Sequence, residues 1–436
     1  MKKILFIVID GLGDEPIPAL GNKTPLEAAR TPNLDFLAKK GVSGLVLPYT
    51  EKQKPPTSED THLAIFGCQP KIFNPGRGVL EALGIGLEIL PGDVCLRGNF
   101  ATVNTRTLKI IDRRAGRIEK TKDLIEAISG FEVAETLSHL PARAATRRSA
   151  IGEVHPASIL RNGTGVKFLI GKAVSHRIGI VMRGENLSPK VSDSDPKITG
   201  VRPLQVKPLD ESKEAKFTAR ILNQFLDKSH SILKEHPLNK KRKLPANYIL
   251  VRGAGKIKKM KAFKEKYNLR AAFVAAGTLY KGIGRFLGMK EIRVKGATAL
   301  PTTNLKGKLI AAKKGLKNYD FVFCHIKAAD SLAEDGNFIG KKKFIERIDK
   351  NLKPILGFKN SLIVITGDHS TCSLIKQHCL EPLPIVIYSD KIKTDAVKEF
   401  SERDCQKGNL GKIKQIDLMS KILLYRNFNN FDTSLL

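Results

Sequence analysis

The sequence predicts an α/β fold built on a mostly parallel sheet with helices on both faces. Short continuous apolar runs bounded by Gly, Pro or Asp recur, at 4–9, 248–251, 271–276, 320–326, 361–366 and 384–388. Runs of this kind are typical of strands buried on both faces. Between several of them lie helical patterns, such as residues 344–352, whose apolar side chains form one stripe. Strands that alternate with helices indicate parallel pairing.

The middle of the chain differs from its two ends. From about Gly92 to Pro245 the apolar runs are shorter and more polar, and one long amphipathic helix is predicted around residues 217–226. A chain of 436 residues is expected to form two or three domains. We therefore predict one α/β core made of residues 1–91 and 256–436, interrupted by an inserted α+β domain of residues 92–255.

Composition predicts a globular protein that does not span a membrane. Hydrophobic residues make up 42% of the chain, and no apolar run approaches the roughly 20 residues needed to cross a bilayer. The run 4–9 ends at Asp10 without a small-residue cleavage site, which predicts a buried first strand and not a signal peptide. The oligomeric state is not indicated by the sequence.

The net charge of +32 favours an anionic partner. Nucleic acid is one such partner, but the basic runs are scattered, Trp is absent and no nucleic-acid-binding signature occurs. We therefore expect most of the excess lysine to be solvated surface.

The six cysteines, at positions 68, 95, 324, 372, 379 and 405, contain no CxxC pair. This spacing predicts neither a zinc ribbon nor a disulfide framework. A reducing cytoplasm is the expected location.

The segment 54–67, KPPTSEDTHLAIFG, presents a serine at the start of a predicted helix. Either Thr57 or Ser58 is placed to cap this helix, and Glu59 and Asp60 suit the positive end of its dipole. Free backbone N–H groups at a helix start attract anions such as phosphate. Ser58 is therefore a candidate nucleophile, although the window alone is more typical of an ordinary N-cap.

Acidic and imidazole side chains follow two of the predicted strands. Asp10 closes the run 4–9, and Asp368 with His369 closes the run 361–366. In open α/β sheets ligands bind beyond the carboxyl ends of the strands, so these side chains are expected on one rim. With Ser58 they would offer three oxygen ligands and one imidazole, a set suited to Mg, Mn or Zn.

A second group follows the run 320–326. Asp330 and Glu334 are four residues apart and share one face of a helical turn, and His378 lies further along the chain. Two metal ions about 4 Å apart would clamp both sides of a phosphoryl displacement. On spacing alone the group also describes a solvent-facing acidic pair and a surface histidine. His325 ends a strand as well, without a partner visible in the sequence.

Polar and cationic side chains near other predicted strand ends are candidates for substrate binding: Asp112, Arg113, Arg114, Arg117, His176, Arg177, Arg252, Lys281 and Lys327. Arginine forks suit carboxylate and phosphate oxygens, although any one of these is more often a surface charge. The run 282–288 has only a weak dinucleotide-type glycine pattern, and no Walker A or kinase signature occurs.

Taken together, these segments resemble the archaeal-type cofactor-independent phosphoglycerate mutases of the alkaline phosphatase superfamily. The resemblance runs nearly end to end and includes SEDTHLAIFG, GRGVLEALGIGLEILPGDVCLRGNFATV, DRRAGRIEK, GTLYKGIGR, HIKAADSLAEDGNF and TGDHSTCSLIKQH. Such a resemblance implies an alkaline-phosphatase-like core with a mostly parallel sheet, interrupted by an inserted substrate-binding domain.

The resemblance also implies roles for single residues. Ser58 matches the nucleophile that is transiently phosphorylated. One implied metal site consists of Asp10, Ser58, Asp368 and His369, and the other of Asp330, position 334 and His378. The pair that handles the substrate hydroxyl and carboxylate corresponds to Asp112 and Arg113. Further substrate contacts are expected from Arg177, Arg252 and Lys281.

Two departures from the family pattern stand out. The usual Asp-x-x-Gly-His around the second metal reads Asp330-Ser-Leu-Ala-Glu334, so a carboxylate replaces a histidine ligand. A glutamate adds negative charge and favours harder ions such as Mn or Mg over Zn. The nucleophile segment reads SEDTH where relatives read SDTAH, which keeps the serine and the histidine four residues later.

The implied activity is an isomerase of glycolysis and gluconeogenesis that interconverts 2-phosphoglycerate and 3-phosphoglycerate. It would use a phosphoserine and two divalent metal ions, with Mn or Mg favoured over Co or Zn, and no bisphosphoglycerate. A phosphomonoesterase or a mutase of another phosphorylated metabolite is the first alternative, because the same core supports other substrates. A nucleic-acid-binding protein on a decayed enzyme scaffold is the second.

Overall fold

The computed structural model describes residues 2–51, 54–129, 132–133 and 165–427. This part of the chain divides into two compact units, unit 1 of residues 1–74 and 258–436 and unit 2 of residues 75–257. Among these residues no helix is long and apolar enough to span a bilayer.

Unit 1 is built on an eight-stranded sheet in the order β10-β9-β11-β1-β12-β15-β2-β16. Its strands are β1 (Lys3–Ile9), β2 (Gly41–Leu47), β9 (Ala271–Val274), β10 (Lys290–Glu291), β11 (Phe321–Ile326), β12 (Ser361–Thr366), β15 (Leu383–Tyr388) and β16 (Gly411–Lys414). Only β15 pairs antiparallel with its neighbours. The mostly parallel core predicted from the sequence is confirmed, because its apolar runs are strands buried on both faces.

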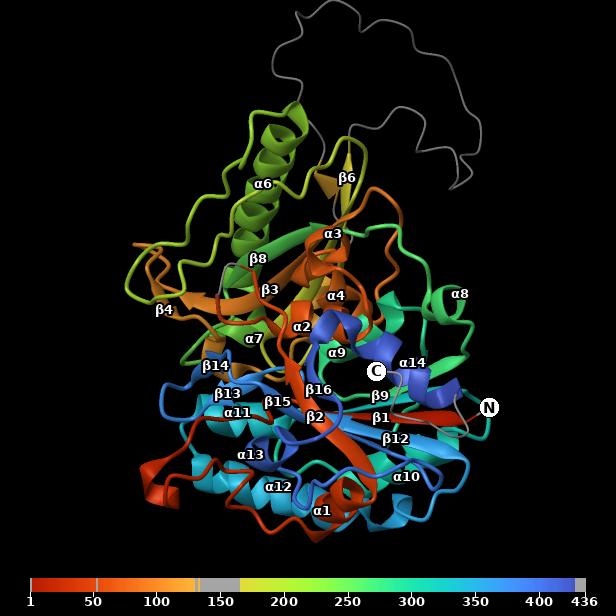
Figure 1. The fold of residues 1–436 in the computed structure, drawn as a ribbon. Coiled ribbons are helices and arrows are strands. Elements are labelled where there is room, and N and C mark those ends of the chain that lie inside the picture. Colours follow the sequence, from red (N-terminus) through yellow and green to blue (C-terminus); the bar gives the residue numbers. More distant parts are fainter. Residues whose placement is uncertain (1, 52–53, 130–131, 134–164, 428–436) are drawn as a thin grey trace, which may run out of the picture. The chain divides into compact units, whose positions relative to one another are not determined.

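Helices cover both faces of this sheet (Figure 1). On one face α1 (Pro32–Lys39), α10 (Leu305–Gly315) and α12 (Phe338–Leu352) pack together. The other face carries α2 (Ser58–Ile65), α9 (Thr278–Phe286) and α14 (Leu418–Asn427). The remaining helices of unit 1 are α3 (Pro70–Phe73), α8 (Phe263–Tyr267), α11 (Ala328–Glu334) and α13 (Glu402–Cys405).

Unit 2 contains a six-stranded antiparallel sheet in which β3 pairs with β4, β7 and β8. Its strands are β3 (Val94–Val103), β4 (Ile110–Asp112), β5 (Glu132–Val133), β6 (Val166–Lys172), β7 (Arg177–Arg183) and β8 (Tyr248–Lys256). The helices are α4 (Arg77–Ile85), α5 (Lys122–Ile128), α6 (Lys213–Glu235) and α7 (Pro237–Lys240). The apolar stripe of α6 packs into the main core of this unit.

The helix α4 belongs to unit 2, whereas the sequence analysis placed the first domain junction after residue 91. Val79 and Ala82 of α4 pack on Cys95 and Val181 of the sheet. Gly78 lies so close to β3 and β8 that a Cβ there would meet the carbonyl oxygen of Cys95 at 2.3 Å. Because α4 packs this closely on the sheet of unit 2, it belongs to that unit. The junctions therefore lie at 74/75 and 257/258.

One acid of unit 1, Glu402, has a buried carboxylate that makes stability depend on pH. Burial raises the pKa of Glu402 to about 7, from 4.5 for an ordinary glutamate. Thr24 Oγ1 donates to one carboxylate oxygen at 2.9 Å, and the other has no hydrogen-bond partner among the described residues. The folded protein therefore holds this proton more tightly than the unfolded chain. Its contribution to stability is present below pH 4.5 and is lost as the pH rises through 7.

We expect Glu402→Gln to raise the free energy of unfolding by roughly 2 kcal/mol at pH 8, because the amide stays neutral at the same site. At pH 4 wild type and variant should unfold alike. Urea denaturation at both pH values measures this difference, and equal stabilities at pH 8 would show that Glu402 ionises freely.

Candidate metal centre and nucleophile

Three adjacent parallel strands bring the predicted strand-end acids to one rim of the sheet. The strand β1 lies between β11 and β12, and both pairs are parallel. Asp10 follows β1, Asp368 and His369 follow β12, and Asp330 lies in the first turn of α11 after β11. All four side chains are buried, although they come from segments far apart in the sequence.

Two groups of possible metal ligands converge there. The ligand atoms of Asp10, Asp368 and His369 lie within 4.8 Å of one another, and we name these residues cluster 1. The ligand atoms of Asp330, His369 and His378 do the same, and these residues form cluster 2. His369 belongs to both clusters, and its ring stacks on that of His378 with centroids 3.7 Å apart.

The electrostatics of the clusters fit divalent cations. Burial and the nearby charge of Asp10 raise the pKa of Asp368 well above its usual range, and its Oδ2 has no hydrogen-bond partner among the described residues. Burial lowers the pKa of His369 to about 3, which keeps the imidazole neutral and ready to act as a ligand. Crowded carboxylates beside neutral imidazoles need positive charge, and a divalent metal ion supplies it.

Ser58 presents its hydroxyl to this site. It is the first residue of α2, and the N-cap is Thr57, whose Oγ1 accepts the N–H of Asp60 at 3.2 Å. The sequence left open which of the two caps. Because Thr57 does so, the Ser58 hydroxyl is left for another partner, and it lies 3.3 Å from Nε2 of His369. The side chain is only 7% exposed.

Two histidines whose roles the sequence did not reveal support the carboxylates of cluster 1. Nε2 of His325 donates to Asp10 at 3.0 Å, and Nδ1 of His62 donates to the Ser58 carbonyl at 2.8 Å while lying 3.3 Å from Asp368. Burial lowers the pKa of His325 to about 3 and that of His62 to about 4. These contacts join residues on different strands and helices, and the local sequence does not indicate which elements lie side by side. Only the four-residue spacing from Ser58 to His62 was a visible signal.

Lys327 is the cation of the described site. Its Nζ lies 3.3 Å from Oδ1 of Asp10 and also hydrogen-bonds Asp330, so that it bridges one carboxylate of each cluster. Burial would lower the pKa of this ammonium, but Asp10 and its other neighbours raise it well above its usual range. The lysine is therefore charged at neutral pH.

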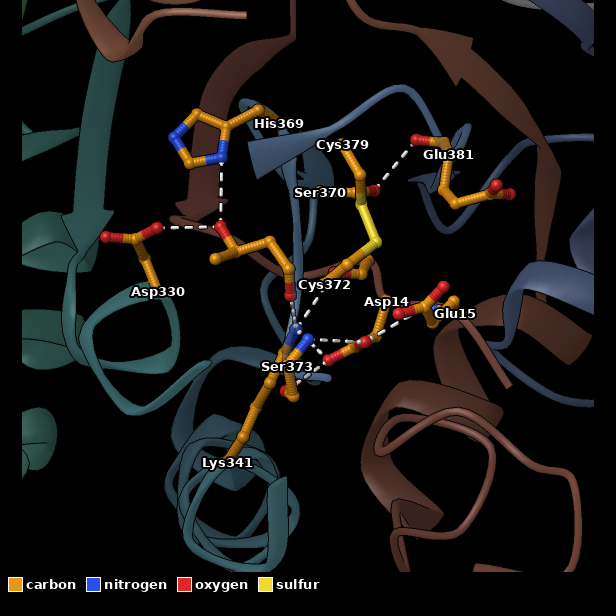
Figure 2. Close-up of a disulfide and its surroundings, with 12 residues drawn as sticks. Asp14, Glu15, Asp330, Lys341, His369, Ser370, Cys372, Ser373, Cys379 and Glu381 are labelled. Carbon is orange, nitrogen blue, oxygen red and sulfur yellow. Dashed lines mark hydrogen bonds and ion pairs between the residues drawn. A yellow bond between two sulfur atoms is a disulfide. The ribbon is translucent and has the colours of Figure 1, made fainter. Parts of the chain in front are cut away.

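Thr371 links the two clusters through its hydroxyl. Its Oγ1 donates to Asp330 at 2.7 Å and lies 3.2 Å from Nδ1 of His369 (Figure 2). Because this oxygen gives its proton to the carboxylate, it accepts one from Nδ1 of the imidazole. The lone pair of Nε2 is then directed to Ser58 or to a metal ion. Thr371 lies in β13 (Ser370–Cys372), which pairs with β14 (Gln377–Cys379).

A buried ion pair anchors β13 and the loop after β1 to α12. Nζ of Lys341 lies 2.9 Å from Asp14 and donates to the carbonyls of Gly13 and Thr371 (Figure 2). Asp14 also accepts the N–H and hydroxyl of Ser373. Both charged side chains are fully buried. Removal of the lysine alone would leave an uncompensated carboxylate in the interior.

We expect Lys341→Met to lower the free energy of unfolding by about 3 to 5 kcal/mol. Lys342→Met is the matched control, because Lys342 is partly exposed and pairs only at the surface with Glu346, at 3.0 Å. The control variant should lose less than about 1 kcal/mol of unfolding free energy, measured by urea denaturation. Equal losses in the two variants would mean that the buried pair has no special role.

The structure contains one disulfide that the cysteine spacing did not indicate. Cys372 and Cys379 are bonded, with their Cα atoms 5.9 Å apart, while Cys68, Cys95, Cys324 and Cys405 are free and buried. Neither a CxxC pair nor a framework spacing marks this bond in the sequence. This bond depends instead on the register of a short hairpin, in which Cys372 lies opposite Gln377 and Cys379 opposite Ser370.

The predicted ligand Glu334 is not brought into either cluster. It is the last residue of α11 and is exposed, while Asp330 at the start of the same helix is buried. His378 does reach cluster 2, where its Nε2 lies 3.4 Å from Asp330 and its Nδ1 donates to the carbonyl of Pro56 at 2.7 Å.

Several of the predicted substrate contacts gather in unit 2. Arg113 forms a two-bond fork with the buried Asp195, at 2.9 and 2.7 Å, and Arg252 lies 3.8 Å from the same carboxylate. Burial and the positive charge of Arg177, Arg252 and other arginines lower the pKa of Arg97 to about 9, against the opposing charge of Glu81.

Two further candidates, Asp112 and Lys281, have internal partners. The carboxylate of Asp112 accepts the N–H groups of Arg114 and Gly116 at 2.6 and 3.1 Å. Lys281 lies in α9 of unit 1, where its Nζ pairs with Glu291 at 3.0 Å. An anion that approached Lys281 would compete with Glu291 for the ammonium.

Known proteins resemble the chain over nearly its whole length. The family model described as the Metalloenzyme superfamily matches residues 2–424. The 2,3-bisphosphoglycerate-independent phosphoglycerate mutase 1 of Archaeoglobus fulgidus is 41% identical over 427 residues, which cover 96% of each chain. The corresponding mutase of Ignicoccus hospitalis is 40% identical over 435 residues, covering 98% of this chain and 97% of that one.

Solved structures agree with these relatives. The PH0037 protein from Pyrococcus horikoshii has a TM-score of 0.77 at 31% identity and covers 98% of this chain and 97% of its own. The cofactor-independent phosphoglycerate mutase from Thermoplasma acidophilum has a TM-score of 0.68 at 33% identity and covers 98% and 100%. The chain therefore belongs to the metalloenzyme superfamily and, within it, to the family of archaeal 2,3-bisphosphoglycerate-independent phosphoglycerate mutases.

Proposed function

We propose that the protein interconverts 2-phosphoglycerate and 3-phosphoglycerate in the cytoplasm through a phosphoserine on Ser58, without bisphosphoglycerate. The observation that carries this proposal is the hydroxyl of Ser58, 3.3 Å from an imidazole that belongs to both metal clusters. Relatives about 40% identical over nearly the whole chain carry the name of this activity.

In the first step Oγ of Ser58 attacks phosphorus, the new O–P bond forms, and the ester bond to the glycerate oxygen breaks. The serine loses its proton and the released glycerate hydroxyl gains one. In the second step the other glycerate hydroxyl attacks the phosphoserine, and Ser58 recovers its proton. Lys327 contributes fixed positive charge beside the transferring group.

Two divalent ions would be held by cluster 1 with Ser58 and by cluster 2, and we retain Glu334 as a further ligand of the second ion. When bound, such ions lower the pKa of a coordinated hydroxyl and neutralise phosphoryl oxygens. The number of carboxylates favours Mn or Mg over Co or Zn. Hydrogen bonds from Thr371 to Asp330 and from His325 to Asp10 orient these carboxylates for metal binding.

Retention of the glycerate separates a mutase from a phosphatase. We propose that Arg113, Arg177, Arg252 and Lys281 hold the glycerate while Asp112 handles its free hydroxyl. Support comes from the carboxylate of Asp195, which orients two of these arginines and lowers the cost of gathering their charges.

The test is the product that forms from 3-phosphoglycerate. A mutase yields 2-phosphoglycerate with little inorganic phosphate, whereas a phosphomonoesterase yields inorganic phosphate and glycerate. Both products can be counted in one reaction by phosphorus NMR. Inorganic phosphate as the main product would reject the proposed function in favour of hydrolysis.

We expect Arg252→Ala to raise KM for 3-phosphoglycerate by about 10-fold to 100-fold, the loss typical of one charged contact. The same change should increase the share of inorganic phosphate, because glycerate escapes before the second step. Arg202→Ala is the control, since Arg202 lies in unit 2 but is exposed, and its guanidinium donates to the Thr107 carbonyl. An unchanged KM in Arg252→Ala would remove this residue from the binding site.

A further inference from the structure

The disulfide closes the hairpin of β13 and β14, which forms a two-stranded sheet of its own. Thr371 and His378 lie directly opposite each other in this hairpin. Both reach Asp330, through a hydrogen bond at 2.7 Å and a contact at 3.4 Å. Cys372 and Cys379 each neighbour one of these residues and therefore lie on the other face of the hairpin.

The two strands are attached to the protein unequally. β13 is anchored, because Thr371 donates its N–H to Gly13 at 3.0 Å and accepts from the buried Lys341. β14 carries His378, which is held by the Pro56 carbonyl, and it follows an exposed turn in which Leu374 is 50% exposed. An isolated two-stranded hairpin is only marginally stable in water. The disulfide therefore fastens the strand that carries His378 to the strand that is already fixed.

We propose that Cys372–Cys379 is a reversible thiol–disulfide exchange site that controls the affinity of cluster 2 for its metal ion. In the disulfide form His378 is held against Asp330. In the dithiol form β14 loses its covalent tie, His378 samples other positions, and the ion binds less tightly. The proposal rests on the metal-binding role of cluster 2 in the proposed function, and it does not depend on which phosphorylated substrate is used.

The exchange needs a dithiol, either a small molecule or a protein. Its thiolate attacks Sγ of Cys379, which is less buried than Cys372. The sulfur–sulfur bond breaks, a mixed disulfide forms, and Cys372 leaves as a thiolate that takes up a proton. The second thiol of the reductant then displaces Cys379. Two electrons and two protons pass to the protein, and the reductant becomes a disulfide.

The experiment uses the full chain and Mn²⁺ as the probe. Free Mn²⁺ is counted by its electron paramagnetic resonance signal during titration of air-oxidised protein and of protein reduced with a phosphine and desalted without oxygen. We expect two bound ions in the oxidised form. Reduction should lower the affinity for the second Mn²⁺ ion by about 10-fold to 100-fold, the usual effect of losing a group that orients a metal ligand. The affinity for the first ion should stay almost unchanged.

Two variants make the result specific. Cys372→Ser should bind Mn²⁺ like the reduced protein in either condition. Cys68→Ser, which removes a free buried thiol, should respond to reduction as the wild type does. A thiol count on denatured protein, by alkylation and mass spectrometry, should find four free cysteines before reduction and six after it.

Three results would overturn the proposal. Six free thiols in the oxidised sample would show that the bond does not form. Equal Mn²⁺ affinities in both states would show that the disulfide only stabilises the fold. Fewer than two bound ions in the oxidised form would also remove the two-metal centre. Redox-dependent Mn²⁺ binding without turnover of phosphoglycerate would instead leave the inference standing and reject the proposed function.

Discussion

Ser58→Ala is expected to lower the mutase rate by about 10⁴-fold or more, the scale on which loss of a nucleophile acts. Its hydroxyl is the group that forms a bond to phosphorus, and the neighbouring imidazole of His369 cannot replace it because that imidazole is committed to both metal clusters. An enolase-coupled assay measures the rate. Intact mass measurement after an acid quench should find a phosphoryl group on the wild type and none on the variant.

The control for this variant is Thr57→Ala. Thr57 caps α2, so its loss should destabilise the fold by about 1 kcal/mol but keep the phosphoenzyme. Metal binding by Ser58→Ala should change far less than its rate, because cluster 1 keeps its three other ligands. A Ser58→Ala rate within tenfold of wild type would contradict the role of this serine.

Asp330→Asn is expected to weaken the binding of the second Mn²⁺ ion by about 100-fold and to lower the rate by roughly 10³-fold. The carboxylate of Asp330 accepts a hydrogen bond from the Thr371 hydroxyl and contacts Lys327 and His378. It is therefore the centre of cluster 2. An amide removes the charge that the ion requires. Titration with Mn²⁺ and the coupled assay measure the two effects.

Asp335→Asn is the matched control, because Asp335 lies just beyond the same helix and is exposed. It should bind two ions like the wild type. Glu334→Gln should lower the affinity for the second Mn²⁺ ion by no more than about tenfold, since Glu334 is exposed and lies outside both clusters. A loss in Asp335→Asn equal to that in Asp330→Asn would mean that general surface charge, and not coordination, retains the metal.

The strand-end acids were predictable because one physical rule places them. Continuous apolar runs identify strands buried on both faces, and parallel strands end on the same side, so Asp10 and Asp368 were expected to share a rim. His325 could not be assigned in the same way. It pairs with Asp10 only because β11 lies next to β1, and local sequence does not state which strands are neighbours.

Other misses have similar causes. The disulfide depends on the register of a hairpin whose strands have three residues each. The placement of α4 in unit 2 depends on its packing against β3. The sequence of an apolar helix does not indicate which sheet it packs against. Glu334 is a different case: it is exposed at the last position of α11, and its coordination of the second ion stays a prediction.

The most direct test of the account is turnover of 3-phosphoglycerate by purified protein with Mn²⁺ and no bisphosphoglycerate, repeated after treatment with EDTA. We predict formation of 2-phosphoglycerate that stops when the metal is removed, returns when Mn²⁺ is restored, and does not occur with Ser58→Ala. Formation of inorganic phosphate alone would contradict the mutase assignment. No turnover with any divalent ion, together with salt-sensitive binding of nucleic acid, would contradict catalysis itself.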